Sequence, residues 1–271
     1  MNRIIPAVIL LAALSHGLAR ANVVFDSMPS PPRVNDPGVG YQSSDTTEFG
    51  DAISLGGTAR SLTRATVLLS NWAVESDNEA IGRSGGYYAL LTLNLYEPGS
   101  TGPNPVVGTV LASSTMYAFI PWRPEATPGC GTEFGSFPDC SSGLSVPVRF
   151  TFHDEALPDE VIFGLSFNTA TRGGAPTGHP GPYNSLNFVA QAGAPSTGTD
   201  INPDGVERNS GFGPSLTQPE LGDAGIFGPE AGTIADVPAI TLEAIPEPDG
   251  LPLLVPAILG LIAARRMRGR F

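Results

Sequence analysis

Several stretches of the chain alternate hydrophobic and polar side chains with a period of two. The alternation is regular over residues 87–96, 146–152 and 161–167, where every second side chain is apolar. A period of two is typical of β-strands that bury one face and expose the other. Further strands are predicted at residues 62–74, 106–112, 116–120, 186–190 and 237–242.

The residues between these stretches are rich in turn formers, and the whole chain contains 33 Gly and 27 Pro. Turns such as Glu97-Pro98-Gly99 and Asp204-Gly205 separate neighbouring strands. No helical period lies between the strands, which disfavours a parallel α/β sheet. The pattern therefore predicts an all-β fold, a two-sheet antiparallel sandwich of jelly-roll type.

The N-terminus has the three parts of a secretory signal peptide. Arg3 supplies the positive charge, residues 4–14 are apolar, and Ala19-Arg20-Ala21 fits the cleavage signal. We expect residues 1–21 to be a signal peptide and the mature chain to begin at Asn22. An N-terminal membrane anchor is the alternative, although eleven apolar residues are short for a membrane span.

Composition divides the remainder into three segments. Residues 22–192 carry most strand patterns and are the expected β-sandwich body. Residues 193–244 are rich in Gly, Pro and acids and have a last strand near 237–242. Much of this second segment reads as a long loop, a partly ordered stretch or a stalk. Residues 245–271 form a distinct terminal segment.

The terminal segment has three parts in a fixed order. Pro246, Glu247 and Pro248 come first, and an uncharged apolar run follows at 251–264. The run predicts a short hydrophobic helix of about 21 Å, less than the roughly 30 Å of a hydrocarbon core. A basic end then carries Arg265, Arg266, Arg268 and Arg270. By the positive-inside rule this end stays cytoplasmic, so we expect a transient inner-membrane association.

This order resembles the PEP-CTERM sorting segment of exported Gram-negative proteins. The resemblance implies processing by signal peptidase and then by an exosortase, a membrane-embedded transpeptidase that recognises the tail. It also implies a final location at the cell surface or in the extracellular matrix, with exopolysaccharide as a further partner. An ordinary single-pass anchor is the alternative reading of the same residues.

The body resembles an uncharacterised family of exported proteins with interchangeable C-terminal anchors. The matching stretches include Val24-Phe25-Asp26, Glu48-Phe49-Gly50-Asp51 and Ile120-Pro121-Trp122-Arg123-Pro124. Together with others they span most of residues 23–205. The resemblance implies a β-sandwich surface module, and it implies no activity.

Charge and cysteine content narrow the function further. Residues 22–245 contain 24 acidic side chains and eight arginines, and the chain has no lysine. So acidic a body disfavours nucleic-acid binding. Nine residues separate Cys130 from Cys140, and in an exported protein we expect the two to form a disulfide. Two unpaired thiols are the alternative.

One stretch carries a candidate metal site. Asp200, Asn202 and Asp204, followed by Gly205, fit the first half of a calcium-binding loop. Gly211 stands where such a loop needs a bidentate Glu, so a plain Asx turn is the alternative. We expect no other cofactor.

Two further features bear on chemistry at the body's surface. The acids Asp154, Glu155, Asp159 and Glu160 could serve glycoside hydrolysis if two of them faced each other at a set distance. A solvated hairpin is the simpler reading, and no nucleophile elbow is present. Trp122 is the best candidate for an exposed aromatic that stacks on a sugar, with packing against its own loop as the alternative.

The sequence thus predicts an exported surface or extracellular-matrix protein that is not an enzyme and has a structural or ligand-binding role. Two alternatives remain: an extracytoplasmic glycan hydrolase that uses two carboxylates, and an adhesive domain stabilised by calcium.

Overall fold

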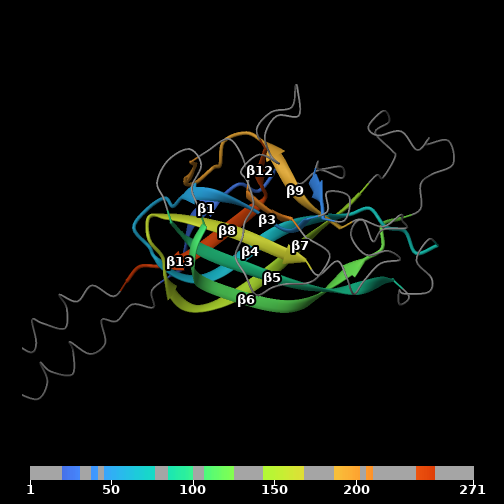
Figure 1. The fold of residues 1–271 in the computed structure, drawn as a ribbon, viewed down its shortest axis with the longest axis horizontal. Helices are drawn as coiled ribbons and strands as arrows, with labels where there is room; N and C mark the ends of the chain where they lie inside the picture. Colours follow the sequence, from blue (N-terminus) through green and yellow to red (C-terminus); the bar gives the residue numbers. More distant parts are fainter. Residues whose placement is uncertain are drawn as a thin grey trace, which may run out of the picture.

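The computed structural model describes residues 20–30, 38–41, 46–76, 85–99, 107–124, 143–167, 186–201, 206–209 and 236–247. These residues form strands joined by turns, without a helix among them. The strands make two antiparallel sheets that pack against each other around one core (Figure 1). The predicted all-β fold and its two-sheet sandwich are therefore confirmed.

One sheet has seven strands and contains both ends of the described chain. Five strands follow one another across it, and two more pair with β9 and β4. In order, these are β1 (Asn22–Asp26), β13 (Ile240–Ile245), β4 (Ser61–Asn71), β9 (Leu186–Ala192) and β12 (Asp236–Pro238), with β2 (Gly38–Gly40) beside β9 and β7 (Leu144–Ala156) beside β4.

The other sheet has six strands and ends in a long edge strand. Five strands follow one another, and one more pairs with β3. In order, these are β10 (Thr199–Asp200), β3 (Thr46–Ser54), β8 (Glu160–Phe167), β5 (Gly86–Pro98) and β6 (Val107–Pro121), with β11 (Val206–Asn209) beside β3.

The core lies between the sheets and is built by the predicted alternation. On β7, Val146, Val148, Phe150 and Phe152 are buried while the residues between them are exposed. A tyrosine joins the sheets: Tyr41 follows β2, and its hydroxyl donates to the Leu165 carbonyl at 2.8 Å. Its buried ring also packs edge-on against neighbouring phenylalanines, so Tyr41 fixes one sheet relative to the other.

A buried carboxylate lies on the opposite side of the six-stranded sheet from this core. Glu48 of β3 is 2% exposed and accepts hydrogen bonds from the Asn94 amide at 2.9 Å and the Tyr96 hydroxyl at 2.8 Å. Gly164 of β8 leaves the necessary room, because a Cβ there would lie 2.4 Å from the Glu48 carboxylate. Burial of this charge is compensated by donors on β5.

Three strand predictions differ from the structure. Residues 237–242 were predicted as one strand, but they are divided between β12 (Asp236–Pro238) and β13 (Ile240–Ile245), which pair with different strands. Residues 106–112 and 116–120 were predicted as separate strands, but β6 is continuous from Val107 to Pro121. The polar residues Ser113 to Thr115 do not turn the chain, because they pair with Asn94 to Thr92 of β5. The strands β1, β2, β3, β10 and β11 had no sequence prediction.

The described residues after 192 include four strands of the sandwich. They supply β10 and β11 to the six-stranded sheet and β12 and β13 to the seven-stranded sheet. β13 pairs with β1 on one side and with β4 on the other. Because β13 joins β1 to β4 in this way, the folded body extends to Ile245.

Candidate functional site

The two ends of the predicted mature chain meet on the seven-stranded sheet. β1 begins at Asn22, the residue after the predicted cleavage signal, and Asn22 pairs with Ala244 of β13. β13 ends at Ile245, and Pro246 and Glu247 follow directly and are exposed. Figure 1 shows β1 and β13 side by side. The predicted sorting motif therefore starts where the sandwich ends, without an intervening linker.

Buried side chains and local hydrogen bonds hold this end of the sheet. Phe25, Ile240 and Leu242 are fully buried. The Ser27 hydroxyl donates to the Pro238 carbonyl at 2.6 Å and accepts from the Ile240 amide at 3.0 Å. These contacts lock the entry to β13 onto the residue that follows β1.

Asp26, the last residue of β1, reinforces the same end. Its carboxylate accepts a hydrogen bond from the Thr241 hydroxyl at 2.8 Å and another from the Ser196 hydroxyl at 2.7 Å. The aspartate thereby ties β1 both to β13 and to the segment that precedes β10. The attachment point of the tail is thus a fixed position on a packed sheet.

Other parts of the predicted sorting apparatus lie outside the described residues. These are most of the signal peptide, Pro248, the hydrophobic helix and the four basic residues Arg265, Arg266, Arg268 and Arg270. Cys130 and Cys140 also lie outside them, so the disulfide stays a prediction. Among the described residues, no helix is long and apolar enough to cross a membrane.

Trp122 is a core residue, so its expected exposure is wrong. Its side chain is 8% exposed and packs on Tyr87, with ring centroids 4.9 Å apart. Its amide donates to the Gly85 carbonyl at 3.1 Å. The nearby side chain of Asn71 donates to the Pro121 carbonyl at 2.8 Å and accepts from the Tyr87 hydroxyl at 3.2 Å. The Pro121-Trp122 segment therefore closes one end of the sandwich.

Two buried tyrosines have perturbed acidity. Burial raises the pKa of Tyr87 well above its ordinary value. Burial, together with the charge of Glu48, raises the pKa of Tyr41 in the same direction. Both hydroxyls therefore stay protonated across the physiological range and act as hydrogen-bond donors inside the fold.

Only the first residue of the candidate calcium loop is described. Asp200 ends β10, where it pairs with Ile53 of β3, whereas Asn202 and Asp204 lie outside the described residues. Within the described part of the chain, no three His, Cys, Asp or Glu side chains gather as a metal site. Calcium binding at Asp200 therefore stays a prediction.

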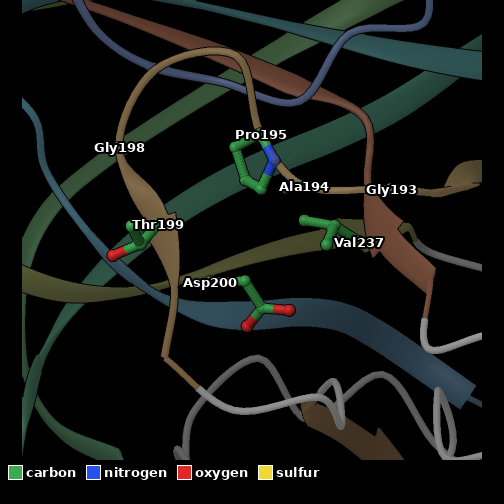
Figure 2. A pocket seen from close by; sticks show the side chains of 7 residues that line it. All are labelled: Gly193, Ala194, Pro195, Gly198, Thr199, Asp200 and Val237. Atoms are coloured by element: carbon green, nitrogen blue, oxygen red, sulfur yellow. The ribbon is translucent and has the colours of Figure 1, made fainter.

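A shallow pocket lies beside Asp200 (Figure 2). Its volume is about 440 Å³. Backbone and small side chains make up most of its wall, and the Asp200 carboxylate is the one ionisable group in it. The lining residues are Gly193, Ala194, Pro195, Gly198, Thr199, Asp200 and Val237.

The acids near residue 154 are divided between β7 of one sheet, β8 of the other and the turn that joins them. Asp154 is exposed and has a φ of 58°, at an irregularity in the pairing of β7 with β4. Glu155 pairs with Leu62 in the seven-stranded sheet, whereas Glu160 starts β8 in the six-stranded sheet. Asp159 is 85% exposed and forms an ion pair with Arg60 at 2.7 Å. This placement gives the hydrolase alternative no geometric support.

The structure also shows a surface feature that sequence reasoning missed. Three aromatic side chains are exposed on the outer face of β5 and β6: Tyr88, Tyr117 and Phe119. The sequence placed Tyr88 on the outward face of its strand. It predicted two separate strands in place of β6, however, and it did not give the register in which β6 pairs with β5. The alternation of Thr115, Tyr117 and Phe119 was the available signal for the other two.

Comparison of the chain with protein-family models, with curated proteins and with solved structures gave no significant match. The fold and the surface features above are therefore the basis on which its function can be argued.

Proposed function

We propose that this chain is an exported protein that is sorted through its C-terminal segment and acts outside the cell as a structural or binding module. The observation that carries the proposal is the junction at Ile245. The folded body ends there, and the Pro-Glu-Pro motif begins with exposed residues at the next position. A processing enzyme needs such an accessible, non-paired backbone to reach a peptide bond.

The N-terminal end supports the same proposal. A signal peptidase that cleaves after Ala21 would leave Asn22 as the first residue of β1. Both proposed cuts thus fall just outside paired strands, and neither removes a residue of the sandwich. The strongly acidic body and the arginine-rich tail fit an outside body and a cytoplasmic end.

The junction also determines how the body is held before processing. Because no spacer separates β13 from the motif, the tail would keep this end of the seven-stranded sheet at the membrane surface. Residues 193–232 cannot serve as a stalk between body and tail, since β12 and β13 follow them in the chain.

The test is the intact mass of the protein recovered from the envelope and from the medium of its native host. Loss of residues 1–21 and of everything after about Pro248 is the expected result. A chain that retains its C-terminus to Phe271 would identify the segment as an ordinary anchor and overturn the sorting proposal.

A matched pair of variants sharpens this test. Glu247 is exposed in the motif, and Glu75 is an exposed glutamate elsewhere on the body. We expect Glu247→Ala to accumulate with its tail intact, whereas Glu75→Ala is processed like the unaltered chain. Equal processing of both variants would show that the motif is not recognised.

A further inference from the structure

The outer face of β5 and β6 carries exposed aromatic surface at the edge of the six-stranded sheet. Tyr117 is 64% exposed, Phe119 is 45% exposed and Tyr88 is 39% exposed. β6 is the terminal strand of this sheet and lies along the lower side of the fold in Figure 1. Large aromatic side chains gathered at the surface of a soluble domain commonly mark a binding site.

The register of the two strands places these side chains next to one another on one face. Tyr88 lies opposite Phe119, and Leu90 lies opposite Tyr117. The rings of Tyr88 and Phe119 contact edge-to-face, with centroids 5.4 Å apart and planes at 64°. This contact holds the two rings in place before any ligand arrives, which lowers the entropy lost on binding.

The same face continues with uncharged polar pairs. The hydroxyls of Thr92 and Thr115 are 2.8 Å apart, and the Ser113 hydroxyl donates to the Asn94 side chain at 2.7 Å. We call the outward faces of residues 88–94 and 113–119 the β5–β6 strip. Along the strip, aromatic rings thus give way to hydroxyl and amide groups, none of them charged, and the Asn94 amide at its end donates to the buried Glu48 carboxylate at 2.9 Å.

Such a surface matches the chemistry of a sugar chain. A pyranose ring has an apolar C–H face that stacks on an aromatic ring, and its edge carries hydroxyls that both donate and accept hydrogen bonds. Hydroxyl side chains likewise have donor and acceptor capacity beyond a single bond. Aromatic and hydroxyl groups spread along an exposed sheet face therefore suit an extended polysaccharide better than a compact ligand, which needs a concave site.

The charge of the protein further restricts the class of ligand that the strip can bind. The chain has a net charge of −12, and its acidic surface repels anionic polymers. The same repulsion opposes the association of two copies through this face. An uncharged strip on an acidic protein is complementary to a neutral polymer.

We propose that the β5–β6 strip binds a neutral polysaccharide, a ligand assignment that rests on the proposed function only for its extracellular setting. Sugar rings stack on Tyr117 and on the Tyr88–Phe119 pair. The oxygens of Ser113, Thr92 and Thr115 accept hydrogen bonds from the adjoining sugar hydroxyls, and the one threonine O–H that the Thr92–Thr115 pair leaves unused donates to a sugar oxygen.

The test is native affinity electrophoresis of the purified protein in gels that contain a soluble polysaccharide. The probes are hydroxyethyl cellulose, a mixed-linkage β-glucan and a mannan as neutral polymers, with alginate as the anionic comparison. At least one neutral polymer is expected to retard the protein, and alginate is not. Retardation by none of the neutral polymers, or by alginate as strongly, would overturn the proposal.

Variants locate the binding on the strip. Tyr117→Ala is expected to weaken neutral-polymer binding about tenfold, which corresponds to roughly 1.4 kcal/mol, whereas Tyr117→Phe keeps the ring and most of the affinity. The control is Val23→Ala, which trims a side chain that is 45% exposed on β1 of the other sheet. Equal weakening by Tyr117→Ala and Val23→Ala would remove the strip as the site.

Sedimentation of the same proteins tests the competing occupant. A dimer that forms in the unaltered chain and is lost in Tyr117→Ala would assign the strip to a second copy and overturn the proposal. Polysaccharide binding is measured on purified protein, so its outcome is independent of tail processing. If the protein recovered from its host keeps its tail but still binds neutral polymer, the sorting proposal fails and the polysaccharide proposal stands.

Discussion

The position of β13 between β1 and β4 in the seven-stranded sheet can be tested by shortening one side chain. Leu242 is fully buried and lies between Phe25 of β1 and Ala65 of β4 in the strand register. Leu242→Ala removes three carbons from this core and leaves a cavity beside both neighbours. Substitutions of this type lower the free energy of unfolding by about 2–5 kcal/mol.

The next residue supplies the matched control. Glu243 points to the other face, where its carboxylate forms an ion pair with Arg64 at 2.8 Å, and the two side chains are 23% and 41% exposed. Ion pairs as exposed as this one contribute roughly 0–1 kcal/mol. Glu243→Ala should therefore cost less than half of what Leu242→Ala costs.

The assay is urea unfolding followed by circular dichroism and by tryptophan fluorescence. With a urea dependence of about 3 kcal/mol per molar, Leu242→Ala should lower the midpoint by roughly 0.7–1.7 M at an unchanged slope. Equal midpoints for the two variants would mean that β13 is not a core strand. The body would then end near residue 192, as composition alone indicated.

Three other changes test the interior. Raising the pH from about 9 to about 11 should lower the midpoint in urea. The raised pKa values of Tyr41 and Tyr87 keep both hydroxyls protonated in the folded protein, whereas the same hydroxyls lose their protons in the unfolded chain. Each group should lower the free energy of unfolding by up to about 1.4 kcal/mol per pH unit. Gly164→Ala should lower the free energy of unfolding by about 1–3 kcal/mol in the same assay, since the new methyl overlaps the buried Glu48 carboxylate. Trp122→Ala should lower it by about 3–5 kcal/mol without changing polysaccharide retardation, because Trp122 belongs to the core and not to the strip.

The parts of the fold that sequence predicted are those whose two faces differ in polarity. β7 alternates Val146, Val148 and Phe150 with Pro147 and Arg149, so its period shows both the strand and its buried face. β5 was predicted for the same reason, because the environment of its side chains changes at most residues and selection for that environment leaves a visible period. β8 is buried on both faces from Val161 to Phe167, and its period comes from large apolar side chains that alternate with Gly164 and Ser166.

The parts that sequence missed depend on partners far away in the chain. β3 carries Glu48 and Asp51, which are both buried, and so its pattern reads as polar. The burial of Glu48 makes sense only once Asn94 and Tyr96 of β5 are beside it. Trp122 follows a proline and looks like a loop residue, but its environment is set by Tyr87 on another strand. Local pattern carries no information on such pairings.

The two ends of the body are the strongest link between fold and proposed function. β13 pairs with β1, the first strand of the proposed mature chain, so under the proposed export the seven-stranded sheet is complete only once residues 240–245 have followed. The motif comes directly after β13, and a cut near Pro248 leaves every paired residue of β13 in the sheet. Processing would therefore release a complete sandwich and not a weakened one. The β5–β6 strip belongs to the other sheet, so the same strip is present on the tethered and on the released protein.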